Sequence, residues 1–220
     1  MNNVNIAKRS TYHHGNLREA LIRAGLRAVA EHGPDGFSLR AVATRAGVTA
    51  AAVYRHFKAK DELLAAIAAE SNERLAATIL EAVADADDDA LARFRAVGIA
   101  YVQFAVANPE HFRAMTVPGL QESLPDDQRR RQEEWQAGQR RDLAAGQRAG
   151  VIVDMPLNEL LIAAHSLVHG LAHMIVEGAL GDVSPARAKE LAIAVTGAFG
   201  NGLIPRAAPV DDPLRPRKRR

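Results

Sequence analysis

The chain has 220 residues, of which 48% are hydrophobic and 25% are charged, so it is long enough to bury a core as one elongated unit or two small domains. It contains no cysteine, which excludes disulfides, cysteine–zinc sites and thiol catalysis. Its net charge of only +2 excludes a uniformly basic protein, although the charge is unevenly distributed.

The N-terminal sixty residues are strongly basic. Residues 1–60 contain ten Lys or Arg against three acidic residues, whereas residues 61–205 carry a net charge of −9 and residues 206–220 a net charge of +4. A basic module attached to an acidic body is expected when one end of a protein meets phosphate groups. Solubility alone would explain the basic residues but not their separation. We expect residues 1–11, with Lys8 and Arg9, to form a flexible basic arm.

Residues 37–64 contain the most informative pattern in the chain. Ser38 is a suitable N-cap for a helix over Leu39–Ala46, and Gly47 supplies the left-handed residue that ends it. Thr49 then caps a second short helix that continues to His56. Two short helices joined by a tight turn with glycine form a helix-turn-helix, whose second helix enters the DNA major groove. A generic helical hairpin would show similar periodicity.

The remainder of the chain is predicted to be helical, because no segment shows the sustained period-two alternation of a strand. A first helix is expected to end near His32, and further helices follow the motif at residues 60–84, 90–106, 109–116, 126–149, 157–180 and 185–203. The fold class is therefore all-α with about nine helices. We find no apolar signal core and no uninterrupted apolar run near the ~20 residues that span a bilayer, so we expect a cytoplasmic protein.

The motif residues closely resemble the N-terminal domain of the TetR family of bacterial transcriptional regulators. The matching pattern is Ala43-x-x-Ala46-Gly47-Val48-Thr49-x-x-x-Val53-Tyr54-x-His56-Phe57-x-x-Lys60-x-x-Leu63, and the resemblance extends upstream through Tyr12–Ile22 to cover roughly residues 10–66. It implies a DNA-binding domain at 12–58, a helical domain for effector binding and dimerisation at 59–205, and a basic tail at 206–220. The tail is expected to be disordered, either solubilising the chain or adding nonspecific affinity for DNA.

The predicted reading helix starts with alanines, which can touch a thymine methyl group but cannot hydrogen-bond a base edge. The family often has glycine or polar residues there, so we expect base readout to depend on Arg40, Arg45 and Arg55. The alternative is that Arg45 or Arg55 is simply solvated. The resemblance implies phosphate contacts elsewhere in the motif. The complete set of residues expected at the DNA is Ser38, Arg40, Arg45, Thr49, Ala50, Ala51, Tyr54, Arg55, His56 and Lys60.

The C-terminal half resembles one TetR subgroup named for a Trp-His-Gly signature, although Val168 stands where the tryptophan would be, before His169-Gly170. The resemblance implies a homodimer held by the last two helices, 157–180 and 185–203. The glycines at 170, 178, 197 and 200 would allow those helices to approach closely. Ordinary packing within one chain would produce the same apolar pattern.

The same resemblance implies an effector pocket among the C-terminal helices, suited to a small, largely apolar molecule. Plain core packing is the alternative for each lining residue. The candidates are Val97, Tyr101, Phe104, Phe112, Met115, Trp135, Leu143, His165, His169 and Met174. We expect a repressor that binds a palindromic operator and is released by this effector, and we expect no cofactor.

Three other function classes fit the sequence less well. His165, His169 and His173 lie at spacings of four residues, which would suit a metal sensor, but no acidic or sulfur ligand accompanies them. An enzyme is not expected, because the sequence has no Gly-rich phosphate loop and no nucleophile elbow. A helical protein with a role unrelated to DNA would leave the basic N-terminal module unexplained.

Overall fold

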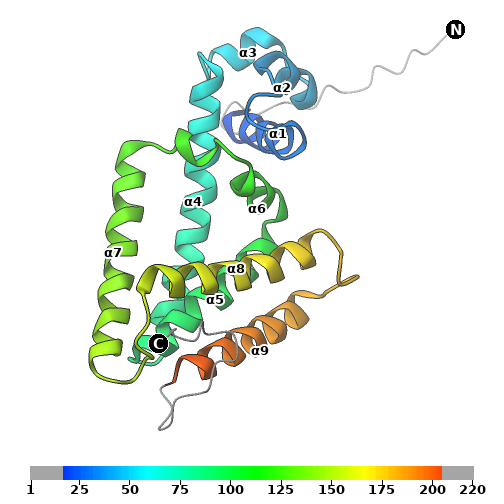
Figure 1. Ribbon diagram of the computed structural model, residues 1–220. Helices are drawn as coiled ribbons and strands as arrows, with labels where there is room; N and C mark the ends of the chain where they lie inside the picture. Colours follow the sequence, from blue (N-terminus) through cyan, green and yellow to red (C-terminus); the bar gives the residue numbers. More distant parts are fainter. Residues whose placement is uncertain (1–16, 205–220) are drawn as a thin grey trace, which may run out of the picture. The chain divides into compact units, whose positions relative to one another are not determined.

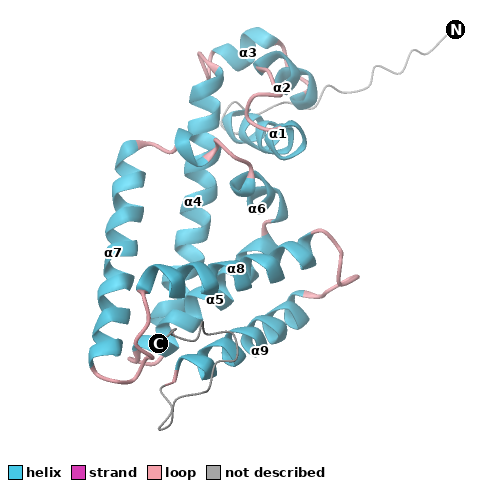
Figure 2. Cartoon of the chain, in the orientation of Figure 1, coloured by secondary structure: helices cyan, strands magenta, loops and turns pink. Residues whose placement is uncertain are grey.

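The computed structural model describes residues 17–204, and all regular structure in that part of the chain is helical (Figure 1, Figure 2). Nine α-helices and one 3₁₀ turn follow one another there, which confirms the predicted all-α class. Their bounds are α1 Leu17–His32, α2 Leu39–Ala46, α3 Ala50–Tyr54, α4 Lys60–Ala84, α5 Ala90–Ala107, α6 Pro109–Thr116, η1 Gln121–Ser123, α7 Asp126–Arg148, α8 Leu157–Val176 and α9 Pro185–Leu203. The expected basic arm at 1–11 and basic tail at 206–220 lie outside the described residues.

The chain packs as two compact units, each considered by itself below. The first unit comprises residues up to Arg74 together with Asn108–Arg129, and the second comprises Leu75–Ala107 and the residues from Arg130 onward. Helix α4 therefore contributes residues to both units, and α6 belongs with the N-terminal helices. The predicted functional boundary at residue 58 stays a prediction, since packing divides the chain at a different place.

The first unit is built around an apolar core shared by α1, α2, α3, the beginning of α4 and α6. Leu21, Val29, Val42, Val53 and Ile67 are all fully buried in it. Burying a side chain of this size stabilises a fold by about 1.5–3 kcal/mol relative to exposure. Helix α6 packs against α1, with Arg27 and Glu110 paired at 2.8 Å. This core holds the short helices α2 and α3 in place. An isolated helix of only five residues, the length of α3, would not be stable in water.

The second unit is organised around α5, which packs against both α8 and α9 (Figure 1). A cluster of Leu143, Ile152, Leu160 and Leu203 joins α7 and the loop after it to the other helices. Several large apolar side chains on α8 and α9 nevertheless remain exposed within the single chain, namely Ile162, Met174 and Ile193. Such side chains are available to a further partner.

Two helices end earlier than the sequence predicted. Helix α3 ends at Tyr54, so Arg55 and His56 lie in the turn that follows, where His56 N–H bonds the Val53 carbonyl oxygen. Helix α8 ends at Val176 rather than at Leu180, because Gly178 and Gly181 adopt left-handed conformations at φ 74° and 72°. Left-handed glycines terminate helices, so the apolar residues beyond Val176 do not continue α8.

Helices α5 and α8 are long and apolar enough to cross a bilayer by length and composition. Neither helix is an uninterrupted apolar run, because polar residues interrupt both, including Arg93 and Arg95 in α5 and Glu159 in α8. Two helices of this kind are weak support for a membrane protein, since core helices of soluble bundles pass the same test. Here α5 is packed between α8 and α9.

Candidate nucleic-acid interface and ligand pocket

The helix-turn-helix geometry of α2 and α3 follows directly from local signals. The side chain of Ser38 accepts a hydrogen bond from Ala41 N–H, and that of Thr49 accepts one from Ala52 N–H, so each residue caps the helix predicted for it. Between the helices, Gly47 adopts φ 68°, and its N–H bonds the Thr44 carbonyl oxygen. Val53 and Phe57 are buried in the core. Burial of these side chains turns the opposite side of α3 to solvent.

The residues predicted to contact DNA lie at the surface or are partly exposed. Tyr54 is 48% exposed, and Arg40, Ala51, Arg55 and His56 are also exposed. Among the described residues the side chains of Arg40 and Arg55 have no ion-pair partner. Both guanidinium groups are therefore free to reach a base edge or a phosphate. The individual contacts of these residues with DNA stay predictions.

The guanidinium group of Arg45, unlike those of Arg40 and Arg55, is already paired with an acidic side chain. Its two terminal nitrogens donate to the two carboxylate oxygens of Glu31 on α1, at 2.9 Å and 2.5 Å. The hydrogen bond from Arg45 holds the pKa of the Glu31 carboxyl below its usual value. This bidentate pair fixes Arg45 against α1, so reading a base would require the pair to break. The sequence did not reveal this competing partner, because Glu31 lies on a separate helix.

Lys60, at the start of α4, is held within the first unit. Its ammonium donates to the Asp35 carbonyl oxygen at 3.2 Å and lies 5.3 Å from the ring centroid of Phe37. These contacts place the charge beside the loop that precedes α2. The helix N-terminus, together with the ammonium, suits a backbone phosphate.

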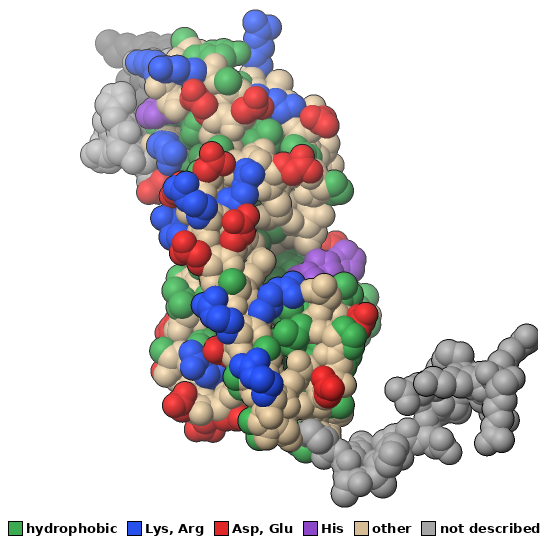
Figure 3. Space-filling model, turned by 60° about the vertical axis from the view of Figure 1, so that its left-hand side comes forward, with side chains coloured by type: hydrophobic (Ala, Val, Ile, Leu, Met, Phe, Trp, Pro, Cys, Tyr) green, Lys and Arg blue, Asp and Glu red, His purple; other side chains and the backbone are tan. Residues whose placement is uncertain are grey.

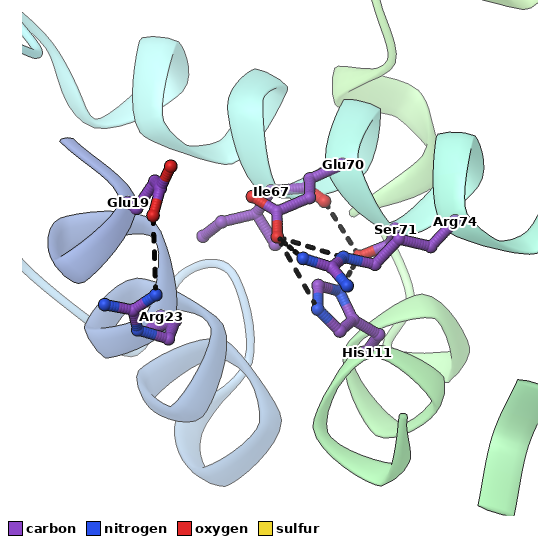
Figure 4. A network of polar contacts seen from close by, with 7 residues as sticks. All are labelled: Glu19, Arg23, Ile67, Glu70, Ser71, Arg74 and His111. Atoms are coloured by element: carbon purple, nitrogen blue, oxygen red, sulfur yellow. Dashed lines mark hydrogen bonds and ion pairs between the residues drawn. The ribbon is translucent and has the colours of Figure 1, made fainter. Parts of the chain in front are cut away.

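A buried polar network that the sequence analysis did not single out joins α4 to α6 (Figure 4). Ser71 donates to the Ile67 carbonyl oxygen at 2.8 Å, and its hydroxyl lies 3.0 Å from Nδ1 of His111. The Ser71 hydroxyl and Nδ1 of His111 are therefore hydrogen-bonded, with the donor set by the imidazole tautomer. Its Nε2 lies 3.7 Å from Glu70, which also pairs with Arg74 at 2.9 Å.

Burial is the main cause that lowers the pKa of His111, and the Arg74 charge adds to it, while Glu70 and Glu110 oppose it. The imidazole is therefore neutral at pH 7. The available sequence signal was a serine within the otherwise apolar face of α4, which is polar yet fully buried.

The second unit contains a cavity of about 590 Å³, within the size range of small-molecule sites. Helices α4, α5, α7, α8 and α9 supply its walls. Four of the predicted effector residues line it, namely Val97, Tyr101, Trp135 and His165. Sequence reasoning missed a polar set along α7 and α5, although glutamines at helical spacing were a visible signal. That set is Arg95, Gln132, Gln136, Gln139 and Arg140.

Six predicted effector residues do not line this cavity. Phe112 and Met115 belong to α6 and hence to the first unit. Phe104 and Leu143 are buried to 1% exposure; Leu143 packs in the apolar cluster with Ile152 and Leu160. Met174 is 43% exposed. Aromatic and apolar residues at helical spacing serve core packing or an exposed face in all of these cases, which periodicity alone cannot distinguish from lining a cavity.

His169, the sixth, lies beside the cavity rather than in its wall. Its Nδ1 is 3.0 Å from the Tyr101 hydroxyl. Its ring stacks between those of His165 and His173, with centroid separations of 5.5 Å and 6.4 Å, and histidine side chains gather on the surface seen in Figure 3. Burial lowers the pKa of His169, and the two neighbouring histidines lower it further. Among residues 17–204 no group of three or more potential ligands is arranged to hold a metal ion.

A capped α2–turn–α3 with exposed basic side chains has the geometry of helix-turn-helix proteins that dock a helix in the DNA major groove. Comparison with known families agrees with that class. Residues 21–67 match the model of bacterial regulatory proteins of the tetR family, and residues 94–199 match that of the tetracyclin repressor-like C-terminal domain. The chain therefore belongs to the tetR family of bacterial regulatory proteins.

Individual relatives agree with this assignment. A helix-turn-helix transcriptional regulator of Mycobacterium tuberculosis is 36% identical over 111 residues, which are 47% of this chain and 46% of that protein. The chain thus spans about half the length of the curated relatives it matches. The Trp-His-Gly subgroup stays a prediction.

Solved structures show the same fold over most of the chain. A Rhodococcus sp. RHA1 protein of unknown function is 31% identical, with a TM-score of 0.64 over 90% of this chain and 100% of that one. A TetR family regulator from Marinobacter aquaeolei VT8 is 20% identical, with a TM-score of 0.66 over 87% and 97%.

Proposed function

We propose that this protein is a transcriptional repressor that binds a palindromic operator as a homodimer and is released by a small-molecule effector. The observation that carries the proposal is the capped helix-turn-helix in the first unit, combined with a separate ligand-sized cavity in the second. A chain with both features can couple ligand binding to DNA affinity, provided the ligand distinguishes two conformations. The proposed site of action is the bacterial cytoplasm, where the DNA lies.

In the proposed complex, the solvent side of α3 faces the major groove. Its alanines approach thymine methyl groups, while Arg40 and Arg55 supply hydrogen bonds to base edges. Thr49, Tyr54, His56 and Lys60 bind phosphates, and Ser38 and Ala50 lie at the edge of the contact. The two reading helices of a dimer would lie about one helical turn of DNA apart, ~34–36 Å.

The proposed dimer uses α8 and α9. The exposed apolar side chains Met174 and Ile193 on these helices support it, as does Gly170, beside which the single chain leaves open space. The other glycines named for close approach have different surroundings, because Gly197 and Gly200 meet Arg95 and Gly178 lies in a turn.

No catalytic role is proposed, and the metal-responsive alternative is not carried forward. The stacked histidines of α8 offer imidazole nitrogens without an accompanying acidic ligand, and Nδ1 of His169 is already engaged by Tyr101. A helical protein with a role unrelated to DNA remains an outcome of the test below.

The test is selection of genomic fragments by the purified protein, followed by binding titrations at two salt concentrations. The expected result is a near-palindromic sequence bound by a dimer, with affinity falling steeply as salt rises and with binding lost in Tyr54→Ala. Weak binding that is equal on all fragments would overturn the operator-reading proposal and direct attention to the cavity alone.

A further inference from the structure

One arginine in the second unit lies in the wall of the cavity without an acidic partner. Arg95 on α5 lines the cavity, and its Nε atom is buried with no hydrogen-bond partner in the structure. Among the described residues it makes no ion pair. Arg93, two residues earlier on the same helix, is instead exposed and lies 3.6 Å from Asp88.

The packing around Arg95 leaves dedicated room for it. A Cβ atom added at Gly197 would lie 3.2 Å from Nη2 of Arg95, and one added at Gly200 would lie 3.1 Å from its Cδ. The two glycines, three residues apart on α9, therefore form a channel along which the arginine side chain lies. Side chains at these positions would press on the guanidinium and its stem. The two glycines of α9 thus leave the space that the Arg95 side chain occupies.

A partly buried cation without a counter-ion is unfavourable, because desolvation is not compensated by pairing. The side chains around the cavity do not compensate for this desolvation cost. None of the described residues that line the cavity is Asp or Glu, and a second cation, Arg140, lines it as well. Arg140 donates to the Asn158 side-chain oxygen at 2.6 Å, which is a neutral acceptor. The cavity therefore presents an excess of positive charge.

The rest of the lining suits a molecule with an apolar body. Phe94, Trp135, Leu161 and Phe199 supply apolar surface, and three glutamines of α7 supply amide groups that can orient a polar head. Guanidinium groups bind carboxylates through a rigid fork of donors, with charge-assisted bonds stronger than those between neutral groups.

We infer that the ligand of this cavity is an amphiphilic organic anion, an apolar body bearing one acidic group, and that Arg95 binds the acidic group. This inference deepens the proposed function, since it names the chemical class of the effector, and it rests on the cavity being the effector site. It adds an acidic group to the small, largely apolar effector that the family resemblance implied. A neutral apolar compound would leave Arg95 unpaired, and a bare inorganic anion would leave the apolar walls exposed.

The experiment compares two fluorescent probes that share one aromatic body. 8-Anilinonaphthalene-1-sulfonate carries an acidic group, whereas N-phenyl-1-naphthylamine lacks it. Each is titrated into the full-length wild type, Arg95→Gln and Arg95→Lys, with Arg93→Gln as the matched control from the same helix. Circular dichroism establishes that each variant is folded. Displacement of the anionic probe by decanoate, by decanol and by inorganic sulfate then separates organic anions from neutral chains and bare ions.

We expect the wild type to bind the sulfonate about ten-fold or more tighter than the neutral probe, as a charge-assisted bond predicts. Arg95→Gln should lose about that factor for the sulfonate while the neutral probe changes little. Arg95→Lys and Arg93→Gln should retain most of the preference. Decanoate should displace the probe, and decanol and sulfate should not.

Equal binding of both probes, or an unchanged preference in folded Arg95→Gln, would overturn the inference and leave the regulator proposal standing. If neither probe binds, the inference is overturned, and the result also counts against an effector site in this cavity. The DNA selection uses no fluorescent probe. A failure of the operator-binding proposal is therefore distinguished from a failure of the ligand inference.

Discussion

Arg40 and Arg45 lie on the same short helix, α2, yet they differ in what holds them. Arg45 is clamped by Glu31 through two hydrogen bonds, whereas Arg40 has no ion-pair partner among the described residues. A free guanidinium can reorganise toward a base without breaking an existing pair. The two positions are therefore suited to different tasks at the DNA.

We predict that Arg40→Ala weakens operator binding by about 1–3 kcal/mol and weakens binding to random DNA much less. Arg45→Ala should have the smaller effect, because its ion pair already competes with the DNA. Lys60→Ala should weaken all sequences alike. Titrations on operator and random fragments at two salt concentrations measure the loss of affinity of each variant for each DNA. Equal losses on both DNAs for Arg40→Ala would remove its role as a base reader.

His111 links α4 and α6 as a neutral imidazole hydrogen-bonded to Ser71 (Figure 4). Because burial lowers its pKa below the ordinary value of 6.5, the folded state resists protonation more than the unfolded state does. Its stabilising contribution is complete above pH 6.5 and is lost as the pH falls through the folded-state pKa.

We therefore expect the free energy of unfolding of the wild type to decrease on going from pH 7 to pH 5 by more than that of His111→Gln. Urea unfolding at a series of pH values measures the difference. Parallel curves for wild type and His111→Gln would contradict the prediction.

Tyr101 provides the corresponding test at alkaline pH in the second unit. Burial raises the pKa of its hydroxyl to about 12, against about 10 for an exposed phenol. Between these values the unfolded state ionises while the folded state does not, so stability falls as the pH rises from 10 to 12.

Tyr101→Phe removes this contribution. We expect the stability difference between wild type and Tyr101→Phe to shift by up to about 2 kcal/mol against the wild type between pH 9.5 and 11.5. Chemical unfolding monitored by circular dichroism measures it. A difference independent of pH would show that the hydroxyl ionises equally in both states.

At the scale of elements, the turn between α2 and α3 depends on one backbone conformation. Gly47 adopts φ 68°, and an added Cβ would meet nothing within 4 Å. Any destabilisation by Gly47→Ala therefore comes from the left-handed backbone alone and not from a clash.

We predict that Gly47→Ala destabilises the protein by about 1–2 kcal/mol. Gly138→Ala, inside α7 where a Cβ would make ordinary contact at 3.7 Å, should instead stabilise it by up to about 1 kcal/mol. Thermal unfolding compares the two. The same sign for both replacements would contradict this account of the turn.

For the whole molecule, the exposed apolar side chains of α8 and α9 decide the oligomeric state in our proposal. Ile193 and Met174 are each 43% exposed in the single chain. A stable interface buries about 800 Å² on each partner, and a charge placed at its centre would be desolvated without a counter-ion.

We expect Ile193→Asp and Met174→Asp to weaken dimerisation at least about ten-fold, on the basis of this desolvation penalty. Leu80→Asp on α4, where Leu80 is 58% exposed, is the control and should leave the dimer intact. Sedimentation equilibrium measures the dissociation constants. Monomeric wild type, or dimers unaffected by both changes, would place the interface elsewhere.

Within residues 17–204, the all-α class, the order of nine helices and the capped α2–turn–α3 were predictable from the sequence. Ser38, Gly47 and Thr49 act within a few residues of their own positions, so a local pattern is sufficient to identify them. Helix termini were less predictable: α8 ends at Val176 because of Gly178, although apolar residues continue to Leu180.

By itself the sequence determined the family of this protein and its helix-turn-helix, because the motif is a set of local signals on consecutive residues. Only the tertiary structure decided which side chains share a site. It placed Phe112 and Met115 in the first unit, paired Arg45 with Glu31, and laid Arg95 over Gly197 and Gly200 at the cavity. These contacts join residues 14 to about 100 positions apart. Long-range packing, rather than helical periodicity, decides them.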